Sequence, residues 1–198
     1  MCNTFHTARS IEAELIPACR RYGLDIVIYN PVAGGLFSGK YTAAALEANP
    51  EQGRFSDAVG IMGGLYRKRY FKNSTFEALS VIEPVVKKHG LTMLETALRW
   101  CVHHSALNIC DNKEKTAKGW VGQDGIIVGV SSLEQLEGNL RDLEKGPLPE
   151  EVVNALDEAW MVAKAGTSNY VSQEVRSVDR NEKANKLMAV AYGLGVYV

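Results

Sequence analysis

A glycine-rich turn that ends in a lysine follows the first strongly apolar run of the chain. The stretch reads DIVIYNPVAGGLFSGKY over residues 25–41, and Gly34 and Gly39 are separated by four residues, with Lys40 directly after Gly39. Turns of this composition bind phosphate, because glycine lets backbone N–H groups approach an anion closely and lysine adds a positive charge. The spacing is close to that of the nucleotide-binding P-loop.

The residue after the lysine argues against a P-loop. The P-loop pattern continues with Ser or Thr, whose hydroxyl binds Mg²⁺, whereas this chain has Tyr41 there and Thr42 one position too late. The other strongly β-like run, residues 126–130, continues into Gly-Val-Ser-Ser and does not end in a metal-binding acid. A nucleotide hydrolase is therefore the discounted alternative, which magnesium-dependent ATP binding would revive.

Composition indicates one soluble globular protein. The chain has 198 residues, of which 46% are apolar and 23% charged, and the 22 basic and 23 acidic residues give a formal charge of −1. This balance offers no sequence-wide reason to bind nucleic acid or an anionic membrane. The four cysteines lack metal-binding spacing, so we expect no metal site and reduced thiols in a cytoplasmic protein. The chain also shows no apolar stretch of membrane-spanning length and no signal-peptide pattern at its start.

Apolar periodicity divides the chain into helices and two short, strongly apolar runs. The runs at residues 25–29 and 126–130 are too apolar to face water on either side, which is typical of strands in a parallel sheet. Two strands are too little sheet for a closed α/β fold of this length, so either further strands lack a clear signal or the chain is part of something larger. The predicted helices span residues 10–22, 75–89 and 92–104, a stretch after Ser131 and Ser132, and 149–164.

Local signals predict where some of these elements begin and end. Ser10 is a candidate N-cap, Gly90 is a good C-cap for the helix before it, and Thr92 is a good N-cap for the helix after it. Residues 42–73 are polar and glycine-bearing, and we expect an excursion above the sheet or barrel. Residues 105–125 lack a clear period and are a predicted loop.

Three segments together resemble a known family. YNPVAGGLFSGKY (29–41), TALRWCVHH (96–104) and IIVGVSSLEQLEGNL (126–140) are similar to the C-terminal part of the aldo-keto reductases, closest to the aflatoxin aldehyde reductase branch. This family folds as a (β/α)8 barrel and reduces aldehydes and ketones with NADPH. The resemblance implies an α/β fold that is an incomplete, C-terminal portion of a TIM barrel, with residues 25–29 and 126–130 as strands 7 and 8. It assigns residues 1–170 to the partial oxidoreductase domain and leaves 171–198 as a tail of unknown structure.

The resemblance also implies an NADPH site at the ends of these strands, where barrel enzymes often bind phosphate. Tyr29 would stack on the nicotinamide, the turn that follows it would wrap the pyrophosphate, and the segment after the second strand would contact the 2′-phosphate and adenine, which favours NADPH over NADH. The alternative is that Tyr29 is a strand-end aromatic and that Ser131 and Ser132 only cap a helix. The implied cofactor contacts are Tyr29, Asn30, Pro31, Val32, Ala33, Gly34, Lys40, Arg54, Gly129, Ser131, Gln135 and Asn139.

The segment GLYRKRYF, residues 64–71, is the candidate substrate contact. By resemblance Tyr66 and Arg69 face the substrate, and the arginine can hold a carboxylate such as that of a semialdehyde acid with two hydrogen bonds. The alternative is a solvated basic turn of helix. His103 and His104 are expected to cap the end of their helix, where cationic histidine suits the dipole, and not to bind metal, since adjacent helical residues point to different faces.

The chain departs from the family in its chemistry. The aspartate, tyrosine, lysine and histidine that support hydride transfer lie in the first half of the family's barrel, and no catalytic residue is assigned here. The loop at 105–125 is longer than in relatives, and Gly138 replaces a longer polar residue. The first interpretation is a truncated NADPH-dependent reductase of small aldehydes or ketones. The second is a non-catalytic dinucleotide-binding or regulatory protein that self-associates or pairs with a full-length relative.

Overall fold

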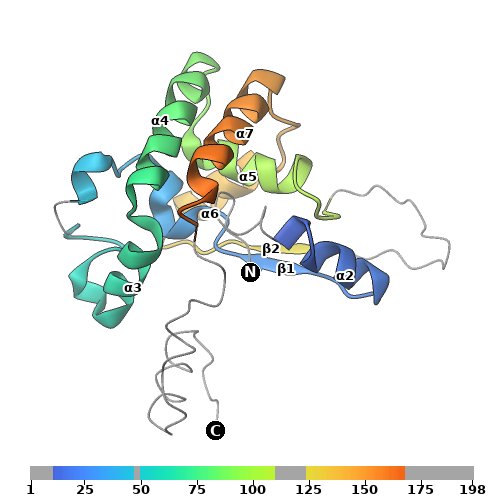
Figure 1. The fold of residues 1–198 in the computed structure, drawn as a ribbon, viewed down its shortest axis with the longest axis horizontal. Coiled ribbons are helices and arrows are strands. Elements are labelled where there is room, and N and C mark those ends of the chain that lie inside the picture. Colours follow the sequence, from blue (N-terminus) through green and yellow to red (C-terminus); the bar gives the residue numbers. More distant parts are fainter. Residues whose placement is uncertain (1–10, 47–49, 110–123, 168–198) are drawn as a thin grey trace, which may run out of the picture.

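A computed structural model describes residues 11–46, 50–109 and 124–167, which form a layer of helices on a pair of parallel strands (Figure 1). No helix in these ranges is long and apolar enough to cross a bilayer. In chain order the elements are α2 (Leu15–Arg21), β1 (Val27–Tyr29), three 3-10 segments (Ala33–Ser38, Ala43–Leu46, Asp57–Val59), α3 (Ile61–Tyr70), α4 (Asn73–Lys88), α5 (Met93–His103), β2 (Gly125–Ile127), α6 (Leu133–Leu143) and α7 (Glu150–Lys164).

Strands β1 and β2 pair in parallel, with Ile28 opposite Ile126, and helices α4 to α7 lie on one side of the pair (Figure 1). Ile28 is fully buried, whereas Val27 and Ile127 are each 56% exposed. Successive strand residues point to opposite faces, so the second face of the pair is open among the described residues. The prediction of two parallel strands is confirmed, but the expectation that both faces are buried is wrong for this part of the chain.

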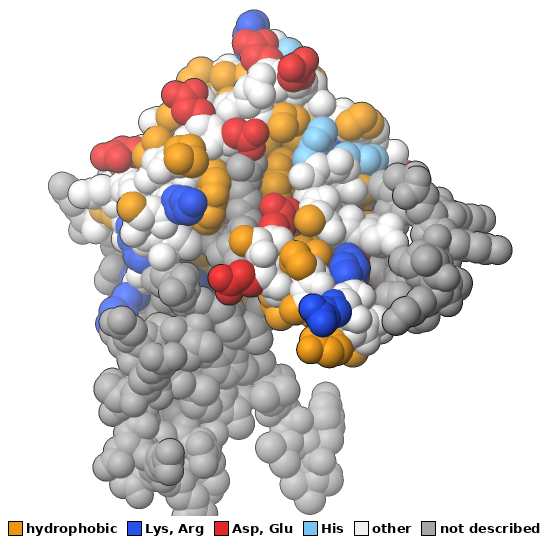
Figure 2. Space-filling view, turned by 45° about the vertical axis from the view of Figure 1, so that its right-hand side comes forward, with side chains coloured by type: hydrophobic (Ala, Val, Ile, Leu, Met, Phe, Trp, Pro, Cys, Tyr) orange, Lys and Arg blue, Asp and Glu red, His pale blue; other side chains and the backbone are white. Residues whose placement is uncertain are grey.

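The helical layer is stabilised by apolar burial, which is most extensive between α4 and α7. Helix α4 packs mainly on α7, and Ile82 of α4 and Val152 of α7 are completely buried. Ala97 and Leu98 of α5 are also completely buried. Burying an Ile, Leu or Val side chain in this way contributes about 1.5–3 kcal/mol. Figure 2 shows that hydrophobic side chains also remain exposed beside basic ones at the lower right of the coloured, described surface.

The helix caps agree with the sequence. The Thr92 hydroxyl accepts a hydrogen bond from the Glu95 amide over 3.0 Å, and the Ser132 hydroxyl accepts one from the Gln135 amide over 3.3 Å. Gly90 ends the preceding helix with φ of +65°, a conformation that glycine adopts without strain. These caps place the starts of α5 and α6 where they were predicted.

The first helix differs from its prediction. Helical structure at residues 11–12 is interrupted by a turn at 13–14, and α2 begins at Leu15, while Ser10 lies outside the described residues. Pro17 explains the interruption, because it has no N–H to donate to the Ala13 carbonyl and its ring would clash with that group.

The stretch at residues 42–73 is more ordered than expected, because it contains α3 and an aromatic cluster. Phe55 is completely buried, and its ring centroid lies 4.6 Å from that of Phe71 and 6.0 Å from that of Tyr66. A Cβ on Gly63 would lie 2.0 Å from the Ser56 carbonyl oxygen, so only glycine lets α3 pack this closely on the segment that contains Ser56. The cluster fixes α3 against the loop that follows β1.

Candidate functional site

The loop that follows β1 has an unusual backbone. Asn30 and Ala33 adopt φ of +62° and +55°, and Gly34 and Gly35 adopt +70° and +102°. Positive φ is uncommon for residues other than glycine, and such strain collects at binding sites. Asn30 holds the loop in place, since its side-chain oxygen accepts the Gly34 amide over 2.6 Å and its side-chain nitrogen donates to the Tyr70 hydroxyl over 3.2 Å.

Most of the loop's amides already have partners inside the loop. Ala33 N–H donates to the Asn30 carbonyl over 3.1 Å, and Gly35 N–H donates to the Val32 carbonyl over 3.0 Å. The Val32 N–H donates to no residue in the described part of the chain. Among the residues expected to wrap a pyrophosphate, the Val32 amide is therefore ready to donate, whereas Pro31 and Ala33 are buried and contribute packing.

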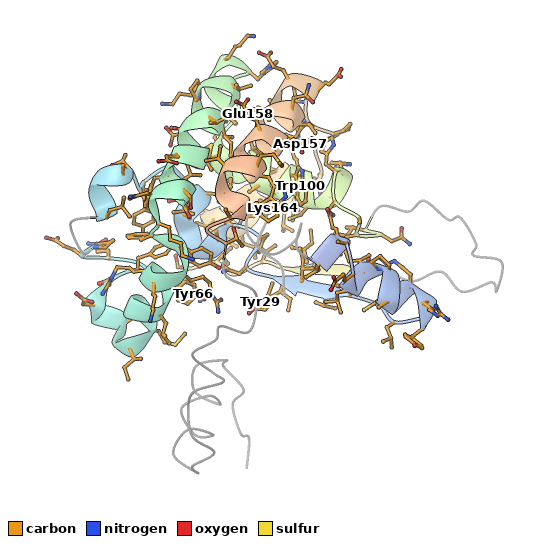
Figure 3. All side chains as sticks on the ribbon, viewed as in Figure 1. Tyr29, Tyr66, Trp100, Asp157, Glu158 and Lys164 are labelled. Carbon is orange, nitrogen blue, oxygen red and sulfur yellow. The ribbon has the colours of Figure 1, made fainter. Side chains whose placement is uncertain are left out.

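Four predicted residues from four segments meet beside this loop. A Cβ on Gly34 would lie 2.8 Å from Cε1 of Tyr66, which comes from α3. Arg54 donates to the Tyr66 hydroxyl over 3.4 Å, and its guanidinium carbon lies 5.9 Å from the centre of the Tyr66 ring. Nη2 of Arg54 is 3.7 Å from the position that a Cβ would take on Gly129, two residues after β2. Figure 3 shows Tyr29 and Tyr66 on the side of the strands away from α4 and α7.

The turn between β2 and α6 forms the second part of the site. The backbone N–H and the hydroxyl of Ser131 both donate to Oε1 of Gln135, each over 3.0 Å, while Ser132 caps the helix. Ser132 thus has the capping role that the alternative interpretation gave to both serines. Ser131 instead presents two donors to one exposed oxygen at a helix N-terminus, a location that favours anions.

Asn139, in the middle of α6, is buried and has no hydrogen-bond partner for its side chain among the described residues. Its exposed fraction is 7%, and its side chain makes no hydrogen bond with any residue in the ranges that the structure covers. Buried amides are normally hydrogen-bonded, and leaving one unpaired costs about 1–3 kcal/mol. The side chain is therefore suited to a ligand that supplies both a donor and an acceptor, as a purine edge does.

The two remaining cationic residues of the prediction, Lys40 and Arg69, lie in different elements. Lys40 is exposed after Gly39, which adopts φ of +75°, and Arg69 is partly buried in the last turn of α3. Tyr66, which was predicted to face the substrate, lies against the loop that follows β1.

The two histidines lie at the end of α5 as expected, with His104 as its C-cap residue, but the expected charge does not hold for His104. The Leu148 N–H donates to Nε2 of His104 over 2.8 Å, so this nitrogen carries no proton, and burial lowers the His104 pKa. The expectation of a cationic histidine at the helix dipole is wrong for His104. His103 Nε2 donates to the Lys145 carbonyl over 2.7 Å. Within the described ranges, no group of three or more His, Cys, Asp or Glu side chains could hold a metal.

Sequence analysis missed Asp124, which directly precedes β2. Its side chain is completely buried and accepts the amides of Ile26, over 2.8 Å, and Asn108, over 2.7 Å, and it pairs with Arg20. Burial alone would raise the pKa of this carboxyl, but the hydrogen bonds from Arg20, Asn108 and Ile26 hold it below its usual value. An acid placed immediately before a strongly apolar run was the available signal.

Comparison with known proteins shows which family this chain resembles. The family described as the aldo/keto reductase family matches residues 2–161. An aldo-keto reductase of Pseudocercospora fijiensis (strain CIRAD86) is 44% identical over 162 residues, which are 82% of this chain and 50% of that protein. Aflatoxin B1 aldehyde reductase member 2 is 40% identical in Rattus norvegicus and 38% in Homo sapiens, over 83% of this chain and 42% and 43% of those proteins. The chain thus spans about half the length of these curated relatives.

Proposed function

The chain belongs to the aldo/keto reductase family, as a partial member, and from that premise we propose that it is the dinucleotide-binding part of an NADPH-dependent aldehyde or ketone reductase. The observation that carries the proposal is the meeting of Gly34, Arg54, Tyr66 and Gly129 beyond the carboxyl ends of two paired parallel strands. Active sites of TIM barrels lie at that end of the strands, and phosphate is often bound after strands 7 and 8. We assign β1 and β2 to those two strands, within a barrel portion at residues 1–170 followed by a tail at 171–198.

The residues present fit a dinucleotide. The Val32 amide and the guanidinium of Arg54 are placed to bind the pyrophosphate, and Lys40 adds charge from the turn. The Ser131 donors at the start of α6 suit a 2′-phosphate, which favours NADPH over NADH. Asn139 offers its unpaired amide to the adenine. NADPH, when bound, supplies the hydride, and Tyr29 orients the nicotinamide ring.

The substrate side of the site is proposed for α3. Arg69 would hold a substrate carboxylate, and Tyr66 would separate the substrate from Arg54, which it contacts. The substrate class is small aldehydes and ketones. The relatives named aflatoxin B1 aldehyde reductases support that class.

The chain by itself is proposed to bind the dinucleotide without transferring hydride. Reduction of a carbonyl needs an acid that protonates the oxygen, and the family's aspartate, tyrosine, lysine and histidine have no counterpart among the residues that resemble the family. The open face of the strand pair, with Val27 and Ile127 exposed, supports a second candidate function: a non-catalytic protein that pairs with a full-length relative.

Two measurements test the proposal. Fluorescence titration of the purified chain should show tighter binding of NADPH than of NADH, and equal affinities would contradict the assignment of Ser131. The chain alone should not oxidise NADPH with 2-carboxybenzaldehyde or succinic semialdehyde. Adding the N-terminal half of a close relative as a separate chain should restore turnover, whereas binding of a full-length relative without new activity would favour the second candidate.

A further inference from the structure

Side chains of α5 hold the connector between α6 and α7, which we define as residues 144–149. Arg99 donates from Nε to the Gly146 carbonyl over 2.7 Å and from Nη2 to the Pro147 carbonyl over 2.6 Å. On either side of these bonds, His103 donates to the carbonyl of Lys145, and His104 accepts the amide of Leu148. Four successive residues of the connector are therefore bound through their backbone by two side chains of α5 and by that of its C-cap residue, His104.

Arg99 is itself held by a buried acid. Nη1 of Arg99 donates to Oε1 of Glu95 over 2.7 Å, and Lys145 of the connector pairs with the same oxygen over 3.1 Å. Glu95 is 5% exposed; burial would raise its pKa, but the hydrogen bonds from Lys145 and Arg99 keep it low. A guanidinium can bond three acceptors at once in this way, whereas a lysine ammonium on a flexible stem cannot reproduce the planar fork.

Helix α6 packs on α5, but few of its side chains are deeply buried. Asn139 is its one buried residue, and Leu133 and Leu140 are 65% and 49% exposed. Helix α7 packs along α4 and buries five of its residues. The position of α6 on α5 therefore depends in part on its C-terminal end, where Arg99 of α5 also binds the connector.

We infer that Arg99 is a positioning residue for the dinucleotide site, because the connector that it fixes determines where α6 presents Ser131, Gln135 and Asn139. This inference rests on the proposed function. Helix α6 has 11 residues. A helix of that length is about 16 Å long, so a tilt of roughly 10° at its C-terminal end moves its N-terminal end by about 3 Å, the length of a hydrogen bond. The Ser131 donors would then no longer meet a 2′-phosphate held by the loop after β1.

The test compares NADPH and NADH affinities of the full chain by fluorescence titration. Arg99→Lys keeps the charge but loses the fork, and it should weaken NADPH by about tenfold while NADH changes by less than about twofold. The matched control is Lys72→Met, which removes the 2.6 Å bond from Lys72 to the Gly166 carbonyl at the other end of α7. The control should leave the ratio of the two affinities as in the wild type.

A second variant and a second readout keep the test valid if Arg99→Lys fails to fold. Glu95→Gln leaves Arg99 in place but weakens its support, and it should lower the NADPH preference in the same direction. Hydrogen exchange should show faster exchange for α6 amides than in the wild type, with those of α4 and α7 unchanged. An unchanged affinity ratio in both variants overturns the positioning role alone. A wild-type chain that does not prefer NADPH overturns the proposed function together with this inference.

Discussion

Ile26 donates its backbone N–H to the carboxylate of Asp124 over 2.8 Å, across a sequence separation of 98 residues. In return, the Gly125 N–H donates to the Ile26 carbonyl over 2.9 Å. Asp124 therefore joins the beginnings of β1 and β2 directly, and its bond with Arg20 adds α2 to the same joint. The loops that carry the proposed dinucleotide site leave from the opposite ends of these two strands.

Replacing this carboxylate should destabilise the fold. In Asp124→Asn the side chain offers one carbonyl oxygen where the carboxylate serves two amides and Arg20, so we expect a loss of about 2–4 kcal/mol in the free energy of unfolding. Urea denaturation followed by circular dichroism measures it. Asp57→Asn is the control, because the Asp57 side chain of the Asp57–Arg67 pair is 61% exposed and such pairs contribute about 0–1 kcal/mol. An equal loss of unfolding free energy in the two variants would show that the buried Asp124 carboxylate contributes no more than an exposed ion pair.

The same residue predicts a dependence of stability on pH. The folded state lowers the Asp124 pKa, so the unfolded state binds more protons in acid and stability falls as the pH falls. The contribution should be complete above the unfolded carboxyl pKa of about 3.9 and should be lost as the pH drops through the lower folded value. Denaturation midpoints measured from neutral pH downwards should fall less steeply in Asp124→Asn. If the denaturation midpoint depends on pH equally steeply in the wild type and in Asp124→Asn, the effect belongs to other acids, such as Glu95.

Gly34 and Gly35 provide a matched pair in the loop after β1. Both have positive φ, but a Cβ on Gly34 would lie 2.8 Å from Tyr66, whereas one on Gly35 would meet nothing within 4 Å. Alanine at either position should cost about 1 kcal/mol of backbone strain, and at Gly34 the collision adds to that cost. Thermal denaturation should show the larger loss for Gly34→Ala. Adding Tyr66→Ala to Gly34→Ala should remove the excess, and a double-mutant cycle without coupling would contradict the contact.

Substitutions of Ser131 and Ser132 should have different effects, because Ser131 is proposed to bind the dinucleotide and Ser132 caps α6. Ser131→Ala should reduce the preference for NADPH over NADH, because it removes the proposed donor to the 2′-phosphate. Ser132→Ala should leave that preference unchanged and cost about 1 kcal/mol of stability through loss of the α6 cap. Lys40→Ala should weaken both dinucleotides alike through their shared pyrophosphate. Fluorescence titration and thermal denaturation of the three variants give both readouts, and a shift in preference from Ser132→Ala would reverse the assignment.

Sequence reasoning succeeded where the deciding interactions are local. Thr92 and Ser132 cap their helices through bonds to residues three positions ahead, so each cap is visible in a short stretch of sequence. Helix α3 was missed because Gly63 and Gly64 weaken its helical signal, and it forms where Gly63 packs on the Ser56 carbonyl. The partners of Asp124 could not be predicted, because they come from distant parts of the chain.

The candidate site was also predictable from sequence only in part. The glycine-rich turn suggested phosphate from spacing alone, but the grouping of Arg54, Tyr66 and Gly129 was expected only from family resemblance. The burial of Asn139 depends on the packing of α6 and has no signature in the sequence.

The joint between Ile26 and Asp124 also bears on the order of folding. Closing a loop of about 98 residues costs roughly 4 kcal/mol in chain entropy by the logarithmic estimate, before the strands gain any contact. Helices α4 and α5 follow each other across the turn at Gly90 and need no such closure. We therefore expect their amides to gain protection first in pulse-labelled refolding, and those of β1 and β2 to follow. The loops of the proposed dinucleotide site would then be assembled last, on a helical layer that already exists.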